Sequence, residues 1–182
     1  MVITATTNYS LDGLKVFQQV AARHVNPKYY AALRIFYLLA GAAAMGIGVY
    51  FLFAVIGGDH DLVSIALVGL GIYMGAQLLN MGIQYYDYFA KRAMASIPGS
   101  GLRNFYSFEK DQIVLSNQAR SGSYSYTQFG YIYETKNYFL FYINVKNGYV
   151  LEKAGIENAT SDQLRELLNS KCTYPVIQLT DI

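Results

Sequence analysis

The sequence predicts a membrane α-hairpin joined to a small α+β domain. Two runs, Ile35–Ile56 and Leu62–Ile83, contain no Asp, Glu, Lys, Arg or His. About 20 apolar residues are enough to cross the hydrocarbon core of a bilayer as a helix. After residue 101, short segments rich in Tyr and Phe follow one another at close spacing and end in an amphipathic helix. This order favours two antiparallel transmembrane helices followed by a compact antiparallel β domain.

The composition supports a membrane location and argues against several classes of partner. Of the 182 residues, 53% are hydrophobic and 14% are charged, against roughly 25% charged in soluble domains. The net charge of +2 is spread along the chain, so no basic stripe is available for nucleic acid. The single cysteine, Cys172, excludes an internal disulfide and a cysteine-based zinc cluster. We expect no nucleic-acid partner and no cofactor.

Residues 1–34 contain a predicted strand and a predicted amphipathic helix. Val2–Tyr9 is rich in β-branched residues, which favours a strand. Apolar residues from Leu14 to Val25 then recur at helical spacing, and Ser10 is placed to cap that helix. Pro27 ends it, because the residue before a proline avoids the α region. The apolar face of this helix packs either on the β domain or on the membrane surface.

The two spans are predicted to be antiparallel neighbours, because only residues 57–61 connect them. Small residues recur four apart in both spans, and such rows let helices approach closely in lipid. The predicted helix-packing positions are Ala40, Ala44, Gly48, Gly71 and Gly75. In the loop, Asp59, His60 and Asp61 suit a turn better than a metal site, because three consecutive residues rarely converge on one ion.

Positive residues predict the orientation of the hairpin. The loop contains no Lys or Arg, whereas Arg23, Lys28 and Arg34 precede the first span and Lys91, Arg92 and Arg103 follow the second. By the positive-inside rule, both termini then lie in the cytoplasm and the loop lies outside.

One face of the second span is polar: Tyr73, Gln77, Asn80 and Gln84 recur at spacings of three and four. Amides at membrane depth normally face a partner helix or a water-filled cavity. These side chains could hydrogen-bond the first span, contact a second copy of the chain, or line a path for a substrate or ion. The first two alternatives are favoured, because two helices cannot enclose a path and no ionisable group is present.

Residues 102–182 are predicted to form an antiparallel meander closed by a helix. Short polar turns separate the strand-like segments, and Thr160 and Gln163 are placed as a capping box for the helix. This layout is that of a pleckstrin-homology-like barrel or sandwich with a C-terminal helix. The predicted parts of the chain are thus residues 1–34, the hairpin 35–83, a connector 84–101 and the β domain 102–182.

Tyrosines recur on both faces of the predicted strands. Either they fill half-buried positions of the sheets, or some of them form an exposed surface for a protein partner, where Tyr is enriched. The candidate partner surface consists of Tyr124, Tyr126, Tyr131 and Tyr133.

The order of these parts and the stretch Tyr126–Ile156 resemble the YcxB-like family of bacterial membrane proteins. The family's pattern of Tyr, Ile, Glu-Thr, an aromatic strand and Ile-Pro-Lys is matched by Tyr126, Ile132, Glu134, Thr135, Tyr138, Phe139, Tyr142 and Lys153, whereas Glu152 stands where the family has Pro. The resemblance implies a place in the inner (plasma) membrane of a bacterial cell and no particular activity. It also implies that Val2–Tyr9 joins the C-terminal sheet, since this segment is too short to form a core alone.

No catalytic constellation is present in the sequence. His24 and His60 fall on opposite sides of the predicted membrane, and no metalloprotease, phosphate-binding or dinucleotide-binding motif occurs. We therefore predict a non-enzymatic, membrane-anchored protein whose β domain binds a partner protein or an inner-leaflet lipid, as a regulator, assembly factor or immunity-type protector. The alternative is a transport accessory or small oligomeric channel that uses the polar face of the second span. The expected partners are membrane lipid and either another protein or a second copy of the chain.

Overall fold

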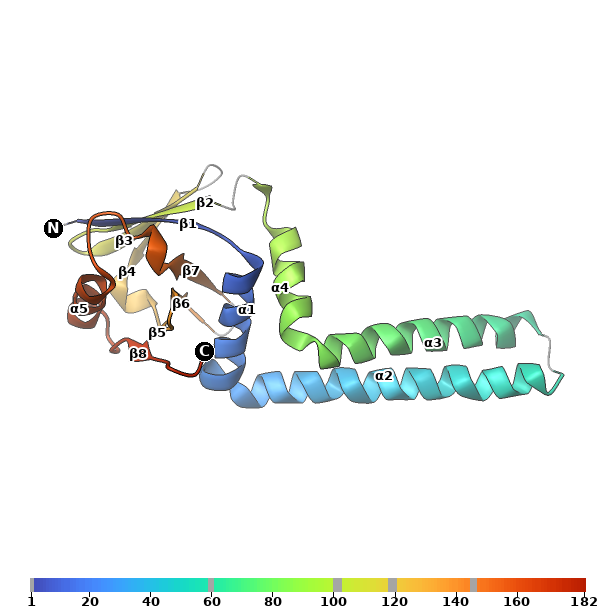
Figure 1. The fold of residues 1–182 in the computed structure, drawn as a ribbon. Coiled ribbons are helices and arrows are strands. Elements are labelled where there is room, and N and C mark those ends of the chain that lie inside the picture. Colours follow the sequence, from blue (N-terminus) through green and yellow to red (C-terminus); the bar gives the residue numbers. More distant parts are fainter. Residues whose placement is uncertain (1, 59–60, 100–102, 118–120, 145–146) are drawn as a thin grey trace. The chain divides into compact units, whose positions relative to one another are not determined.

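The computed structural model covers residues 1–182 and describes all of them except 1, 59–60, 100–102, 118–120 and 145–146. The chain divides into two compact units. Met1–Asn26 and Phe89–Ile182 form the first, called here the β unit, and Pro27–Tyr88 form the second, called the hairpin unit (Figure 1). The hairpin unit is therefore an insertion within the sequence of the β unit.

The β unit contains two four-stranded sheets. The first has the order β1 (Ile3–Asn8), β2 (Arg103–Phe108), β3 (Gln112–Ser116) and β4 (Ser121–Ser125), with antiparallel neighbours throughout. The second has the order β7 (Gly148–Glu152), β6 (Tyr138–Tyr142), β5 (Tyr131–Glu134) and β8 (Ile177–Gln178), and only β8 runs parallel to its neighbour. Two short 3-10 turns, η3 (Tyr126–Gln128) and η4 (Lys153–Gly155), precede β5 and follow β7.

The N-terminal strand joins the C-terminal sheet, which confirms this part of the predicted fold. β1 pairs along its full length with β2, almost a hundred residues later in the chain. Its other edge contacts the segment after β7: the Glu157 N–H donates to the Thr4 carbonyl at 3.0 Å, and Ala5 forms an antiparallel bridge with Ile156. β1 therefore makes backbone contacts along both of its edges and links the two sheets.

The core of the β unit is formed by both sheets and by α5 (Ser161–Lys171). Phe108 of the first sheet, Phe141 of the second and Leu164 of α5 belong to one buried cluster. The predicted capping box starts α5: the Thr160 hydroxyl accepts from the Gln163 N–H at 3.2 Å, and the Gln163 side chain accepts from the Thr160 N–H at 2.9 Å. This cap satisfies donors that a helix start leaves unpaired.

The amphipathic helix α1 (Leu11–Val20) covers the outer face of the second sheet. The Phe17 ring stacks on Tyr142 with 4.3 Å between centroids, and the Tyr142 hydroxyl donates to the Phe17 carbonyl at 2.6 Å. All five residues of β6 are buried, because the core covers one face and α1 the other. The apolar face of α1 thus packs on the β unit rather than on a membrane surface. A π-helical turn, η1 (Ala21–Val25), continues α1.

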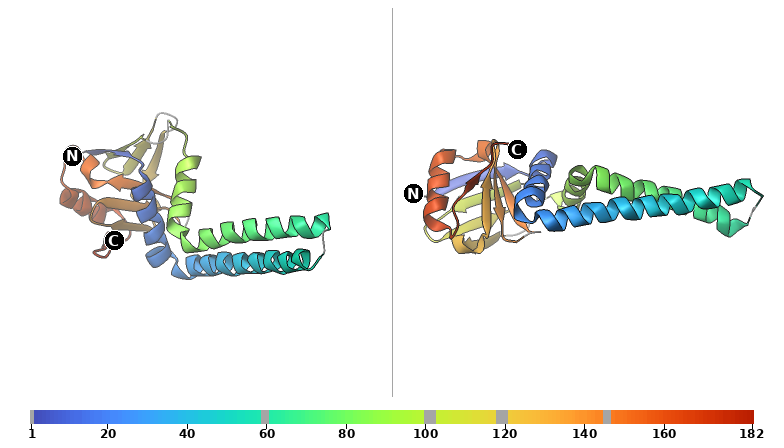
Figure 2. Two further views of the ribbon diagram at one scale, coloured as in Figure 1. Left: turned by 45° about the vertical axis from the view of Figure 1, so that its right-hand side comes forward. Right: turned by 90° about the horizontal axis from the view of Figure 1, so that it is seen from below.

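The hairpin unit contains the antiparallel helices α2 (Pro27–Ile56) and α3 (Leu62–Ile83) (Figures 1 and 2). α3 has the predicted bounds, whereas α2 begins at Pro27 instead of Ile35, since proline is well suited to the first position of a helix. By length and composition both helices could cross a membrane. α4 (Tyr85–Ser96) follows α3 after a single residue, and its part from Phe89 onward belongs to the β unit.

Candidate functional site

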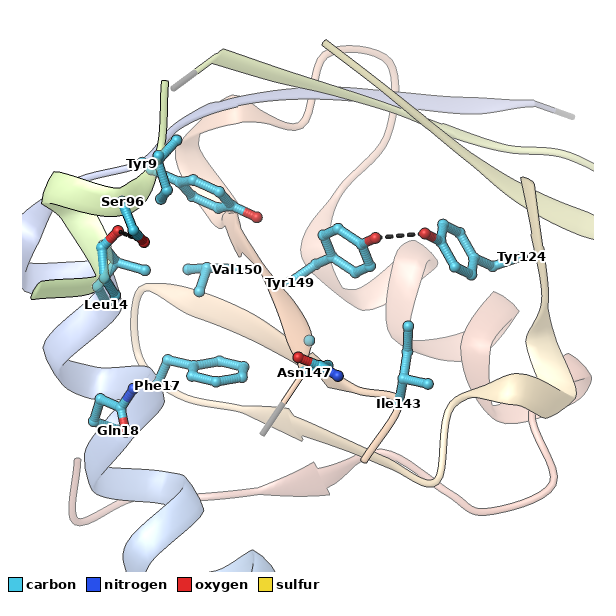
Figure 3. Close-up of a pocket in the computed structure, with 13 residues that line it drawn as sticks. Tyr9, Leu14, Phe17, Gln18, Ser96, Tyr124, Ile143, Asn147, Tyr149 and Val150 are labelled. Atoms are coloured by element: carbon cyan, nitrogen blue, oxygen red, sulfur yellow. Dashed lines mark hydrogen bonds between the residues drawn. The ribbon is translucent and has the colours of Figure 1, made fainter. Parts of the chain in front are cut away.

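The β unit contains a pocket of about 560 Å³ (Figure 3), a volume within the range of small-molecule sites. Leu14 and Phe17 of α1, Ala93 of α4, and Ile143 and Val150 at the ends of the β6–β7 hairpin are among the residues that line it. Together with Tyr124 of β4, the wall is therefore built from four segments that are far apart in the sequence, and most of it is apolar.

Tyrosine hydroxyls are prominent among the polar groups of this pocket. The Tyr124 and Tyr149 hydroxyls share a hydrogen bond of 2.6 Å (Figure 3). Burial raises the pKa of Tyr9 to about 12. Burial, together with the hydrogen bond to Tyr124, also raises the pKa of Tyr149. The Tyr9 and Tyr149 hydroxyls are therefore protonated at neutral pH. No Asp, Glu, Lys, Arg or His is among the described residues that line the pocket.

A wall of this kind suits an uncharged, apolar ligand with a hydrogen-bonding end. Aromatic and aliphatic side chains supply contact area, and the hydroxyls supply a few directional bonds. A phosphate would find no opposite charge on the described wall, and burying an unpaired charge is unfavourable. Within the described residues, no group of three or more His, Cys, Asp or Glu side chains could hold a metal ion. Asp59 and His60 lie outside the described residues.

The thiol and the described imidazole, two groups that could act in catalysis, lie away from this pocket. Cys172 follows the last residue of α5, and burial raises the pKa of its thiol to about 11. Little of the nucleophilic thiolate is then present at neutral pH. His24 lies beside the ring of Tyr133, with 5.8 Å between ring centroids. Neither residue lines the pocket.

Glu134 and Lys153, from the stretch that resembles a known family, belong to a buried ion cluster. The Glu134 side chain is 3% exposed, and its carboxylate accepts hydrogen bonds from Nε and Nη2 of Arg165 and lies 2.6 Å from Lys153 Nζ. Burial alone would raise the pKa of Glu134, but the hydrogen bonds from Arg165 and Lys153 outweigh it and leave the pKa lowered. Next to it, the Thr135 hydroxyl accepts from the Tyr138 N–H at 3.1 Å in the β5–β6 turn.

Residues 108–168, from the end of β2 to α5, match the family model of YcxB-like protein. This segment of the chain is therefore similar to the YcxB-like family. This match confirms the family resemblance predicted from the sequence, and the matched range includes Glu134, Lys153 and Arg165. No curated protein and no solved structure matches the chain.

The predicted partner surface is wrong for two of its four tyrosines. Tyr126 and Tyr133 are each 3% exposed, and the Tyr126 hydroxyl donates to the Glu109 carbonyl at 2.8 Å. Tyr124 is half-buried, and its hydroxyl shares a hydrogen bond with Tyr149 at the pocket wall. Tyr131 is 45% exposed. In a strand with one exposed face, buried and exposed residues would alternate. In β5, by contrast, three consecutive residues are buried.

The two apolar helices meet at predicted small residues. A Cβ atom on Gly71 would lie 2.6 Å from the Gly48 Cα and 2.9 Å from the Ala44 carbonyl oxygen. A Cβ atom on Gly75 would lie 2.7 Å from the Met45 backbone nitrogen. At these distances a side chain would push the two backbones apart.

Gly41, rather than Ala40, completes this row on α2. A Cβ atom on Gly41 would lie 2.8 Å from the Leu79 backbone nitrogen, whereas Ala40 is half-buried beside it. Gly41 and Gly48 are seven residues apart, which returns a helix to nearly the same face after two turns. In the sequence, this row is therefore marked on α2 by a spacing of seven residues rather than four.

The polar residues of α3 face away from α2. Tyr73 is 65% exposed on the hairpin unit, and Gln77, Asn80 and Gln84 are exposed as well. At about 100° per residue, they lie on the side of the helix opposite the glycine row that includes Gly71. Among the described residues, the Gln77 and Asn80 side chains have no hydrogen-bond partner. The alternative in which these amides bond to the first span is therefore wrong.

Proposed function

We propose that this protein is a membrane-anchored binding protein without enzymatic activity. In this proposal, α2 and α3 cross the plasma membrane of a bacterium, and the β unit has a pleckstrin-homology-like fold on the cytoplasmic side. Two apolar helices and two sheets closed by a terminal helix support it. The orientation is supported by positive residues on both flanks of the hairpin and none in the loop.

The observation that carries the proposal is the uncharged aromatic pocket. Catalysis by acid–base or nucleophilic groups needs side chains whose pKa is matched to the reaction, and the described wall offers only tyrosine and serine hydroxyls and amides besides apolar groups. Contact area and a few hydrogen bonds are what reversible binding needs. The β unit would thus bind the apolar part of an inner-leaflet lipid or an apolar side chain of a partner protein.

The connections of the chain favour the acyl chain of a lipid as the occupant. α1 leads through a short turn into α2, and α4 follows α3 after Gln84, so both helices that line the pocket are joined to the proposed spans. In this arrangement the membrane supplies acyl chains at high local concentration, which favours their binding over that of a dilute soluble ligand.

Photo-crosslinking from the pocket rim tests this function and separates the two occupants. p-Benzoylphenylalanine placed at the exposed Asn147 of the full chain should give an adduct with the mass of a membrane phospholipid when cells are irradiated. A band larger by the mass of a protein would identify a protein partner instead.

Two tryptophan variants on one helix provide the matched control. Ala93→Trp fills the pocket from α4 and should lower the adduct yield severalfold, whereas Ala95→Trp places the same ring on the exposed side of α4. If both variants label as well as the parent protein, the pocket is not the binding site.

A second function is favoured by the polar residues of α3. Because Gln77 and Asn80 are exposed on the hairpin unit, several copies could turn them toward a shared path, as in a transport accessory or small oligomeric channel. Solute flux into liposomes that contain the protein, and its loss in Gln77→Leu, would support this alternative over the first.

A further inference from the structure

We infer that two copies of this chain associate in the membrane through a polar stripe, which consists of Tyr73, Gln77 and Asn80 of α3 and of Gln84, the residue that follows this helix. The inference rests on the membrane placement proposed above but not on the pocket. It assigns to each side of α3 a different contact: the glycine row packs on α2 of the same chain, and the polar stripe packs on α3 of the second copy.

Among the described residues of the hairpin unit, the Gln77 and Asn80 side chains of the stripe have no hydrogen-bond partner. Inside a bilayer there is no water to bond an amide, and an unsatisfied polar group there is unfavourable. α2 lies on the opposite side of α3, where Gly71 and Gly75 are in backbone contact with it. A second molecule in the bilayer can supply the partner that α2 does not.

A second copy fits this stripe because amides are self-complementary. Each amide both donates and accepts hydrogen bonds, and none of the four side chains is charged, so no oppositely charged partner is required. Two copies with the same orientation in a membrane are related by a two-fold axis along the membrane normal. Residues at one depth then meet their own counterparts, Gln77 with Gln77 and Asn80 with Asn80. In such a pair the amides of the two copies hydrogen-bond one another, which leaves no pore between the copies.

Disulfide crosslinking in native membranes tests this arrangement. In a Cys172→Ser background, Gln77→Cys and Asn80→Cys should each form covalent dimers on mild oxidation. Leu39→Cys is the matched control: Leu39 is 67% exposed, and its near neighbour Gly41 contacts Leu79, so it lies close to the depth of Asn80. It occupies the side of α2 away from α3 and should remain monomeric. Equal crosslinking at all three positions would overturn the inference.

A second measurement tests the amides themselves. Energy transfer between labelled full-length chains, diluted stepwise in liposomes, should show that Gln77→Leu with Asn80→Leu weakens association by about tenfold or more. Tyr50→Leu on α2, at a residue 69% exposed, should change it little. Unchanged association of the amide variant, or assemblies larger than dimers, would overturn the inference. Release of the protein from membranes by alkaline carbonate would instead contradict the membrane placement.

Discussion

Glu134 places a full charge in the interior of the β unit, and three segments of the chain depend on it. The carboxylate belongs to β5, Lys153 to η4 and Arg165 to α5. Removing one member of a buried ion pair leaves the others without compensation and costs about 3–5 kcal/mol. The Glu and Lys of the family pattern are therefore explained by folding, and no ligand has to be invoked for them.

Glu134→Gln should lower the free energy of unfolding by about 3 kcal/mol, because two cations would then face a neutral amide. Urea unfolding of the detergent-solubilised protein, followed by near-ultraviolet circular dichroism, measures the change. Asp162→Asn removes the exposed partner of the same Arg165 and should cost less than about 1 kcal/mol. Equal decreases in the free energy of unfolding for the two substitutions would show that the buried ion cluster stabilises the fold no more than an exposed ion pair.

The lowered pKa of Glu134 also predicts a dependence of stability on pH. In the unfolded chain this carboxyl has a pKa of about 4.3, so the unfolded state binds a proton before the folded state does. The stabilisation is complete above the unfolded value and is lost as the pH falls through the folded value. As the pH falls below about 5, the free energy of unfolding of the parent protein should decrease more than that of Glu134→Gln. Parallel pH profiles would contradict the assignment.

At the scale of elements, the packing of α2 on α3 depends on backbone proximity, which two glycines on one helix can test. Gly71→Ala would place a methyl group against Gly48 and should destabilise the hairpin by about 1–3 kcal/mol, the usual effect of overpacking. Gly69→Ala adds the same group where nothing lies within 4 Å, so it should be neutral or slightly stabilising. Unfolding in a series of sodium dodecyl sulfate concentrations compares them, and equal stabilities would refute close packing.

Elements with a strong local signal could be predicted from the sequence, and those decided by tertiary contacts could not. The capping box at Thr160 and the uninterrupted apolar run of α3 determine their own structure locally. By contrast, nothing near Tyr126 indicates that it begins a 3-10 turn with its ring in the core. The direction of Gln77 depends on which face of α3 the glycines use. The pocket could not be foreseen, because α1, α4 and the β6–β7 hairpin meet there only after folding.

At the scale of the whole molecule, the C-terminal part of the β unit should not fold without the N-terminal segment. β1 contributes Ile3 and Ala5 to the core, and α1 covers β6. Residues 103–182 expressed alone should give a poorly dispersed amide spectrum and aggregate, because an exposed strand edge invites pairing between molecules. Adding residues 1–27 through a flexible linker should restore a dispersed spectrum. Good dispersion from the fragment alone would show that β1 is dispensable.

The proposed orientation has its own test at this scale. His60, which lies outside the described residues, belongs to the loop that should face the outside of the cell. With Cys172→Ser, His60→Cys should react with an impermeant maleimide in intact cells, because the loop lacks the positive residues that mark the cytoplasmic side. A cysteine at Lys136 in the β unit should react only after lysis. The reverse pattern would invert the orientation.

The insertion of the hairpin between β1 and β2 has a consequence for the synthesis of the protein. The ribosome delivers β1 first, and its partner strand emerges roughly 5–20 s later at ordinary rates of translation. If α2 and α3 span the membrane as proposed, both helices would enter the bilayer in that interval and return the chain to the side from which it started. A chain that crossed only once would leave β1 on one side and β2 on the other. Under the proposed topology, completion of the sheet would depend on correct insertion, and incorrectly inserted chains would be exposed to the proteases that remove unfolded ones.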